Sequence, residues 1–103
     1  MKNRMERINS LLRKEISLII MQDINDPRIG FISIISVDCS SDLKNAKVYF
    51  TSQSNDKKKM EMLLNRASGF IGHRLGEKMR LKYIPHLFFI YNNTEIIPET
   101  DIG

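Results

Sequence analysis

The chain has 103 residues, a single cysteine and a formal net charge of +4. This length suits one domain with a small core, and the lone Cys39, expected to be a free buried thiol, excludes an internal disulfide. Because no apolar run reaches the length of a membrane span and residues 1–10 lack the apolar segment of a signal peptide, the sequence predicts a soluble cytoplasmic protein.

Basic residues are unevenly distributed along the chain. All 16 Lys and Arg residues lie at or before Lys82 together with nine acidic residues, a net charge of +7, whereas residues 83–103 carry −3. A basic domain of this size favours a nucleic acid or another acidic surface as its partner, because binding releases counterions from phosphates. The alternative is a composition that is simply low in acidic residues.

Apolar residues recur every three or four positions from Met5 to Ile20. This spacing predicts one long amphipathic helix over residues 2–22. Pro27 disfavours a helical conformation at Asp26, so the helix ends before this pair, and Gly30 then releases the chain into a strand.

Two segments typical of β-strands follow the first helix. Residues 31–40 are rich in β-branched side chains, and apolar and polar residues alternate over residues 43–52. Their short polar connection predicts an antiparallel hairpin. A polar loop comes next, in which Ser54, Asn55 or Asp56 can cap another helix.

Residues 57–80 have a helical period that contains three glycines. On one straight helix Lys78 would lie in the middle of the apolar stripe set by Met60 and Leu64, which would bury a charge. A change of phase removes this conflict. We therefore predict two helices, residues 57–67 and 70–80, joined by a kink at Ala67-Ser68-Gly69.

A third strand is predicted over residues 84–92, with Pro85 at its start. The element order is thus α-β-β-α-kink-α-β, which predicts an α+β fold with a three-stranded sheet and helices on one face. The KH domain of the second type, an RNA-binding fold, has this order. We expect one KH-like RNA-binding domain over residues 1–92 and a flexible acidic tail over residues 93–103.

Short motifs occur in order along nearly the whole chain. They are an Arg-rich first helix, INDPRIG at 24–30, VDCS at 37–40, DL at 42–43 with AKVY at 46–49, ASGF at 67–70, and LK at 81–82 with PHLFF at 85–89. Together these motifs and their spacings resemble the bacterial ribosome-binding factor A family.

The resemblance implies a non-enzymatic assembly factor that binds the small (30S) ribosomal subunit and 16S rRNA. Such a factor acts late in subunit maturation, supports processing of the precursor 16S rRNA and matters most in the cold. It implies a monomer without a cofactor, a metal, a membrane or a small-molecule substrate. In this family the Gly-x-x-G loop of KH domains is replaced by an Ala-x-Gly kink, which Ala67-Ser68-Gly69 matches.

Gly69 and Gly72 are spaced as in a phosphate-binding Gly-x-x-G turn. The residues between them, Phe70 and Ile71, are large and apolar, and exposing both would forfeit about 1.5–3 kcal/mol each. We therefore expect both side chains in the core, and we do not interpret the four residues as a phosphate cradle.

Candidate RNA contacts lie on the basic flanks of the three helices and around the kink, where i,i+7 and i,i+4 spacings put pairs of cations on one side. Each one has the alternative role of a solvated surface residue. Charge reversal at two of them, Arg74 and Lys78, is expected to weaken subunit binding without unfolding the domain. The full set is Arg4, Arg7, Lys14, Lys57, Lys58, Lys59, Arg66, Ser68, Arg74, Lys78, Arg80 and Lys82.

The chain departs from the family pattern at three places. Gly72 stands where the family commonly has Arg, and Asn92 where it usually has Asp. The tail is short and interrupted by Pro98, in contrast to the helical extension of many members. One expected charge is therefore absent beside the kink.

Two other classes of function compete with RNA binding. An enzyme could use His73, His86 and Cys39, but their spacing matches no catalytic motif. The preference of Asp and Asn for turns explains the acidic residues near Pro27 better than a metal site does. A KH-like adaptor that uses an exposed strand edge, or an RNA-binding module not specific to the ribosome, is the stronger alternative. Salt dependence separates RNA binding from a protein contact.

Overall fold

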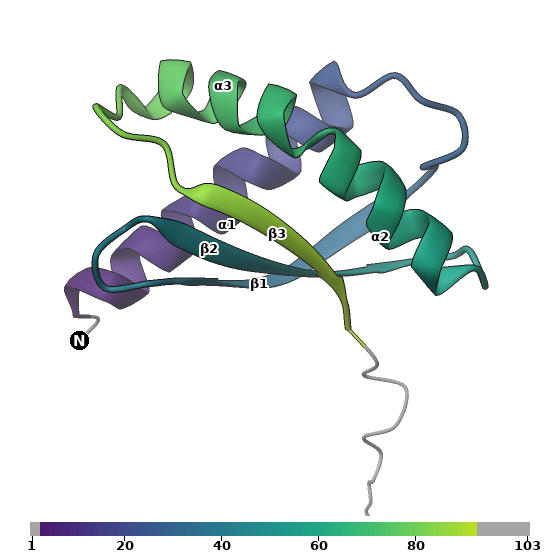
Figure 1. Ribbon diagram of the computed structural model, residues 1–103, viewed down its shortest axis with the longest axis horizontal. Helices are drawn as coiled ribbons and strands as arrows, with labels where there is room; N and C mark the ends of the chain where they lie inside the picture. The colour runs from purple at the N-terminus through teal and green to yellow at the C-terminus, as the bar shows by residue number, and fades with distance from the viewer. Residues whose placement is uncertain (1–2, 93–103) are drawn as a thin grey trace, which may run out of the picture.

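The computed structural model describes residues 3–92 as three helices that cover one face of a three-stranded sheet (Figure 1). The predicted α+β class and element order are confirmed, with ends shifted by one or two residues; the tail, residues 93–103, lies outside the described part. The elements are α1 (Arg4–Asp23), β1 (Ile32–Cys39), β2 (Asn45–Ser52), α2 (Lys57–Arg66), α3 (Ser68–Met79) and β3 (His86–Tyr91).

α1 begins later than predicted because Asn3 caps it from outside. The Asn3 side chain accepts a hydrogen bond from Glu6 N at 2.8 Å, and Glu6 Oε1 accepts one from Asn3 N at 2.9 Å. This capping box satisfies two backbone donors that the first turn of a helix leaves unpaired. The Asn-x-x-Glu pattern was present in the sequence and indicates the boundary.

The sheet has the order β1-β2-β3. β1 and β2 are antiparallel, which confirms the predicted hairpin, and β3 runs parallel to β2 after the crossover through α2 and α3. A bulge in β1 places Ile35 between the pairs formed by Ile34 and Ser36. The extra residue lets Ile34 and Val37, three positions apart, face the same core, which strict alternation would forbid.

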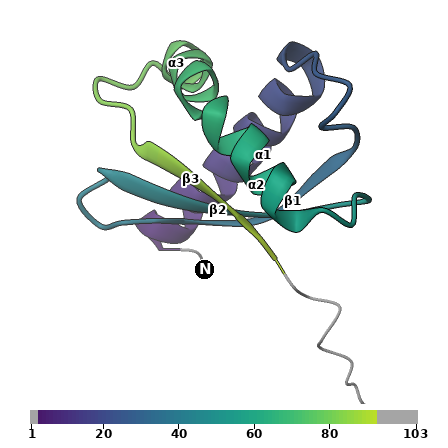
Figure 2. The ribbon, with the colours of Figure 1, turned by 45° about the vertical axis from the view of Figure 1, so that its right-hand side comes forward.

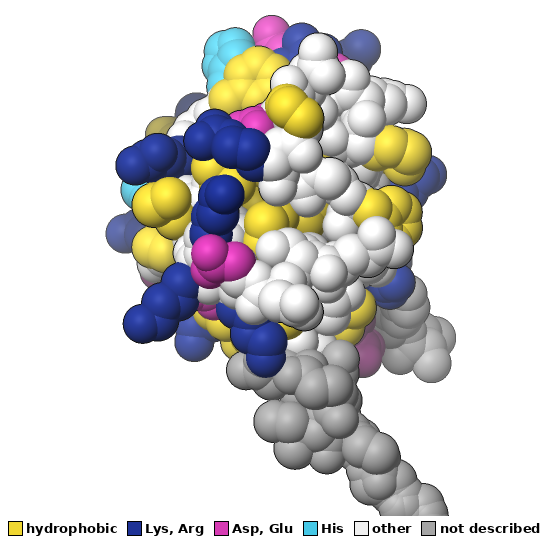
Figure 3. Space-filling model, turned by 90° about the vertical axis from the view of Figure 1, so that its right-hand side faces the viewer, with side chains coloured by type: hydrophobic (Ala, Val, Ile, Leu, Met, Phe, Trp, Pro, Cys, Tyr) yellow, Lys and Arg dark blue, Asp and Glu magenta, His cyan; other side chains and the backbone are white. Residues whose placement is uncertain are grey.

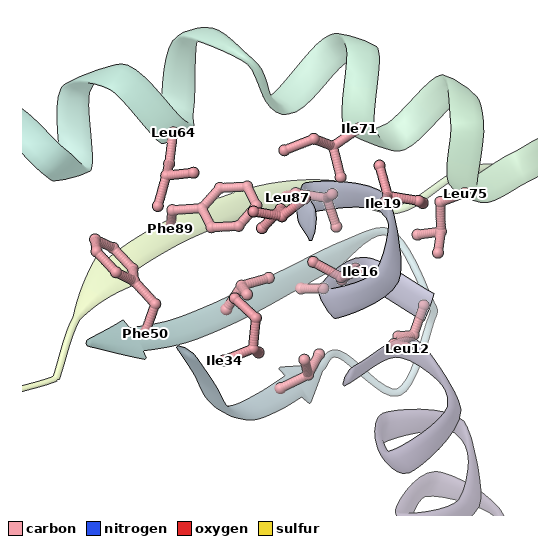
Figure 4. Packing of buried hydrophobic residues seen from close by; sticks show 14 of the residues in the cluster. Leu12, Ile16, Ile19, Ile34, Phe50, Leu64, Ile71, Leu75, Leu87 and Phe89 are labelled. Carbon is pink, nitrogen blue, oxygen red and sulfur yellow. The ribbon is translucent and has the colours of Figure 1, made fainter. Parts of the chain in front are cut away.

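The core fills the space between the helices and the inner face of the sheet. Figure 4 shows side chains of α1 and of the α2–α3 pair meeting residues of β2 and β3, among them Phe50 and Phe89. Cys39 is buried at the end of β1, as predicted, and burial raises the pKa of its thiol. The fully buried large side chains are Phe50, Leu12, Ile16, Ile19, Met60, Leu64, Ile71, Leu75 and Val48.

The outer edge of β1 is hydrogen-bonded to side chains of α1. The Asn9 Oδ1 atom accepts from Cys39 N at 2.9 Å, and Arg13 Nε donates to the Ile34 carbonyl oxygen at 3.2 Å. Asn9 and Arg13 are one helical turn apart, so the same side of α1 supplies both contacts. These bonds occupy backbone groups that a new strand would need.

The outer edge of β3 is covered in the same way by α2. The Asn65 amide donates to the Phe89 carbonyl oxygen at 3.0 Å and accepts from Phe89 N at 2.8 Å, and Glu61 Oε2 accepts from Tyr91 N at 2.7 Å. Glu61 and Asn65 are again one turn apart. With both edges engaged by helix side chains, the sheet offers little to a partner that binds by adding a strand.

Candidate RNA-binding surface

The predicted kink between the two later helices is present and takes up a single residue. Ala67, the one residue between α2 and α3, has φ −86° and ψ −1°, and its N–H is shared between the carbonyl oxygens of Leu63 and Leu64 at 3.2 and 3.1 Å. Its own carbonyl oxygen accepts from Ile71 N at 2.9 Å, so helical bonding continues while the axis changes direction.

The prediction for the two apolar residues after the kink is half right. Ile71 is fully buried, but Phe70 is 48% exposed. The buried side of α3 is formed by Ile71, Gly72, Leu75 and Gly76, and Phe70 points about 100° away from Ile71, on the side opposite to Gly72. An aromatic ring is therefore presented to solvent beside the kink, which the sequence prediction missed because the pair was treated as one apolar unit.

Gly72 and Gly76 bring α3 close to the segment before β3. A Cβ atom added at Gly76 would lie 2.7 Å from Ile84 Cδ1, and one added at Gly72 would lie 3.3 Å from Ile84 Cγ2. Both glycines are buried. Beside them, a hollow of ≈ 250 Å³ separates the start of α3 from the start of β3, with Ser68 and Gly69 in its lining.

Most of the predicted contact residues are exposed and carry uncompensated charge. Within residues 3–92, eight of these cations make no ion pair, and they do not form one cluster. Those at the start of α1 lie at the far end of that helix from the kink (Figure 1). The eight residues are Arg4, Arg7, Lys14, Lys58, Lys59, Arg66, Arg80 and Lys82, the last with its Nζ 5.6 Å from the centre of the Tyr83 ring.

Three consecutive lysines, Lys57–Lys59, occupy the first turn of α2. They start a full ten-residue helix away from the kink, about 15 Å, so the prediction that they surround it is wrong. Cations at this end oppose the helix dipole at a cost of about 0.3–1 kcal/mol each. Asp56 caps the helix by accepting from Lys59 N at 3.1 Å, and Lys57 Nζ lies 5.4 Å from the centre of the Tyr91 ring.

Arg74 and Lys78 have partners that tie α3 to α1. Arg74 Nε donates to Asp23 Oδ2 at 3.1 Å and its Nη1 lies 3.4 Å from Glu77 Oε1, while Lys78 Nζ lies 3.9 Å from Glu15 Oε1. Charge reversal at these positions would therefore disturb packing between helices. A loss of binding in such variants cannot by itself identify an RNA contact.

Arg80 ends α3 in a left-handed conformation, with φ 54° and ψ 42°. This conformation suits glycine better than arginine, so Arg80→Gly is expected to raise the free energy of unfolding by about 0.5–1 kcal/mol in a urea titration. Arg80→Ala is the control, since it removes the same charge and keeps the strained backbone. Equal stability of the two variants would contradict the role of backbone strain.

The structure also brings close to the kink a basic residue, Arg28, that was not among the predicted contacts. Arg28 lies in the segment between α1 and β1, and its Nε and Nη2 donate to the two carboxylate oxygens of Asp26 at 3.0 and 2.7 Å. These bonds lower the pKa of Asp26.

No helix among the described residues is long and apolar enough to cross a membrane, and none of their side chains group as a metal site.

Known proteins match this chain along most of its length. The family model for ribosome-binding factor A matches residues 4–96. Ribosome-binding factor A of Halothermothrix orenii is 39% identical over 95 residues, which cover 90% of this chain and 78% of the relative. That of Staphylococcus carnosus is 42% identical over 95 residues, covering 90% of this chain and 83% of the relative.

Solved structures agree with these matches at the level of the fold. The crystal structure of ribosome-binding factor A from Thermus thermophilus superposes with a TM-score of 0.77 at 20% identity, covering 86% of this chain and 97% of that one. A homology model of the Thermus thermophilus factor, fitted into a cryo-EM map of a 30S complex, gives 0.70 at 23% identity, covering 87% and 93%. The chain belongs to the ribosome-binding factor A family.

Proposed function

We propose that the protein is a non-catalytic, cytoplasmic assembly factor that binds the small ribosomal subunit as a monomer. It contacts 16S rRNA late in maturation, supports processing of the precursor rRNA and matters most in the cold. Membership of the ribosome-binding factor A family supports this proposal, as does the 30S complex into which a Thermus thermophilus relative has been fitted.

The observation that carries the RNA contact is the set of exposed cations without ion pairs on α1, α2 and the end of α3. The first turn of α2 carries three lysines, whose charges oppose the helix dipole. Phosphate groups bound to these lysines would offset the unfavourable interaction with the helix dipole. The candidate contacts are Arg4, Arg7, Lys14, Lys57, Lys58, Lys59, Arg66, Ser68, Arg74, Lys78, Arg80 and Lys82.

In this proposal the protein acts on rRNA through binding energy and not through catalysis. The protein shifts immature rRNA toward one conformation by as much as its affinities for the two conformations differ. The competing adaptor function has weaker support, because side chains of α1 and α2 already engage the strand edges that such an adaptor would use.

Co-sedimentation with small subunits over a range of salt concentrations tests the RNA contact. The variant Lys58→Gln with Arg66→Gln is expected to reduce the slope of log affinity against log salt by about one for each phosphate that the protein no longer neutralises. Lys44→Gln with Lys47→Gln removes the same charge from exposed positions at the hairpin and on the open face of the sheet.

Two outcomes of this experiment contradict the proposal. One is a flat salt dependence for the unmodified protein. The other is an equal change of slope in the two double variants, which would mean that net charge, and not the helix surface, governs binding. Purified precursor rRNA without ribosomal proteins then separates a general RNA-binding module from a factor specific to the assembled subunit.

A further inference from the structure

A second hollow, of ≈ 420 Å³, lies on the other flank of the kink from the one beside β3. Its walls come from the segment after α1 and from the α2–α3 junction, which pass alongside each other in two views (Figure 1, Figure 2). The lining includes Arg28 on one wall and Arg66 and Phe70 on the other. This volume is within the range of pockets that hold small organic ligands.

The interior of the hollow is apolar and ends in an exposed ring. Ile29 and Leu63 contribute to its lining and are 5% and 4% exposed. Phe70 is 48% exposed and makes no ring contact within residues 3–92. An apolar surface beside an aromatic face of this kind suits a flat, unpaired base, because stacking requires a base whose face is free.

The two carboxylates that line the hollow are paired with arginines, and one cation beside them is not paired. Asp26 is engaged by three hydrogen bonds from Arg28, and Asp23 by the guanidinium of Arg74, so that both carboxylates are neutralised. Arg66 makes no ion pair within the described residues. Figure 3 shows this side of the molecule, where Lys and Arg side chains gather along one margin of a hollow with apolar atoms inside.

We propose that this hollow binds one unpaired RNA nucleotide. Its base stacks on Phe70 above the apolar floor, and its phosphate contacts Arg66 and the guanidinium of Arg28, which Asp26 holds in place. This inference rests on the proposed RNA-binding function and specifies it: the kink region reads a single strand, whereas the lysine-rich flanks accept any phosphate backbone.

The absence of tryptophan from the chain allows a direct test. In Phe70→Trp the indole is the only one present, and single-stranded octa-adenylate is expected to quench its fluorescence in a saturable way. Phe88→Trp is the matched control, because Phe88 is 45% exposed on the open face of the sheet, away from the hollow. Its emission is expected to remain unchanged.

Affinity measurements on the alanine variants complete the test. Phe70→Ala is expected to bind octa-adenylate about 5- to 150-fold more weakly, the loss of one base stack, while Phe88→Ala binds like the unmodified protein. Arg66→Gln is expected to reduce the salt slope by about 0.7, the value for one phosphate of a single strand. Circular dichroism confirms that each variant is folded.

Several results would overturn the assignment. Equal affinity of Phe70→Ala and the unmodified protein, or a larger loss in Phe88→Ala, would exclude stacking at the hollow. Emission of Phe70→Trp that changes with protein concentration alone would identify a second copy as the occupant. If subunit binding depends on salt but Phe70→Ala and Arg66→Gln bind octa-adenylate like the unmodified protein, the nucleotide site is contradicted and the proposed function stands. If subunit binding does not depend on salt either, both proposals are contradicted.

Discussion

Asn65→Ala is expected to lower the free energy of unfolding by about 2–4 kcal/mol, because it leaves two backbone groups of Phe89 without partners. The Asn65 amide both donates to and accepts from Phe89, as a neighbouring strand would. An unpaired, partly buried N–H or C=O costs about 1–3 kcal/mol, and this substitution creates one of each. Urea denaturation measures the change.

Two further variants define the reason for that loss. Asn65→Asp retains an acceptor for Phe89 N but cannot donate to the Phe89 carbonyl oxygen, so it is expected to destabilise the protein nearly as much as alanine. Asn55→Ala is the control, since Asn55 is exposed in the loop before α2. A loss in Asn65→Ala no greater than in Asn55→Ala would show that β3 does not depend on this clamp.

The contacts at the two sheet edges also occupy backbone groups that another chain would need for strand pairing. β1 and β3 each have an outer edge, and an uncovered edge invites pairing with another chain. In both cases two residues one helical turn apart reach the edge, Asn9 and Arg13 from α1 and Glu61 and Asn65 from α2. We expect Asn65→Ala to aggregate more readily than Asn55→Ala for this reason.

Most of the fold could be predicted from the sequence because each element carries its own periodicity. The apolar spacing of α1 and the alternation in β2 are local signals, and the phase conflict at Lys78 correctly indicated a break between α2 and α3. The bulge at Ile35 was missed, although Ile34 and Val37 are both apolar at a spacing that strict alternation cannot accommodate.

The candidate surface could be predicted only in part, because charges are visible in a sequence and their partners are not. Arg74 and Asp23 are 51 positions apart, and nothing local indicates that they meet. The exposure of Phe70 likewise depends on which side of α3 the sheet occupies. The sequence therefore predicted a basic protein with a kink, and the structure distinguishes cations that hold helices together from cations that remain available.

The charge reversal Arg74→Glu with Lys78→Glu is expected to lower the free energy of unfolding by about 1–2 kcal/mol. It removes the pairs with Asp23 and Glu15 and places like charges at the packing surface of α1 and α3. The sequence alone led us to expect weaker subunit binding without unfolding of the domain, and the ion pairs add an expected loss of stability. Thermal and urea unfolding measure the loss.

A charge swap separates the structural role of Arg74 from an RNA contact. Adding Asp23→Arg to Arg74→Glu restores an opposite pair at the same place, so stability is expected to recover by at least half of the loss in the single variant. An RNA contact at position 74 would still be missing in the swapped protein. Recovery of subunit binding together with stability would therefore assign Arg74 to the α1–α3 interface, whereas recovery of stability alone would assign it to RNA.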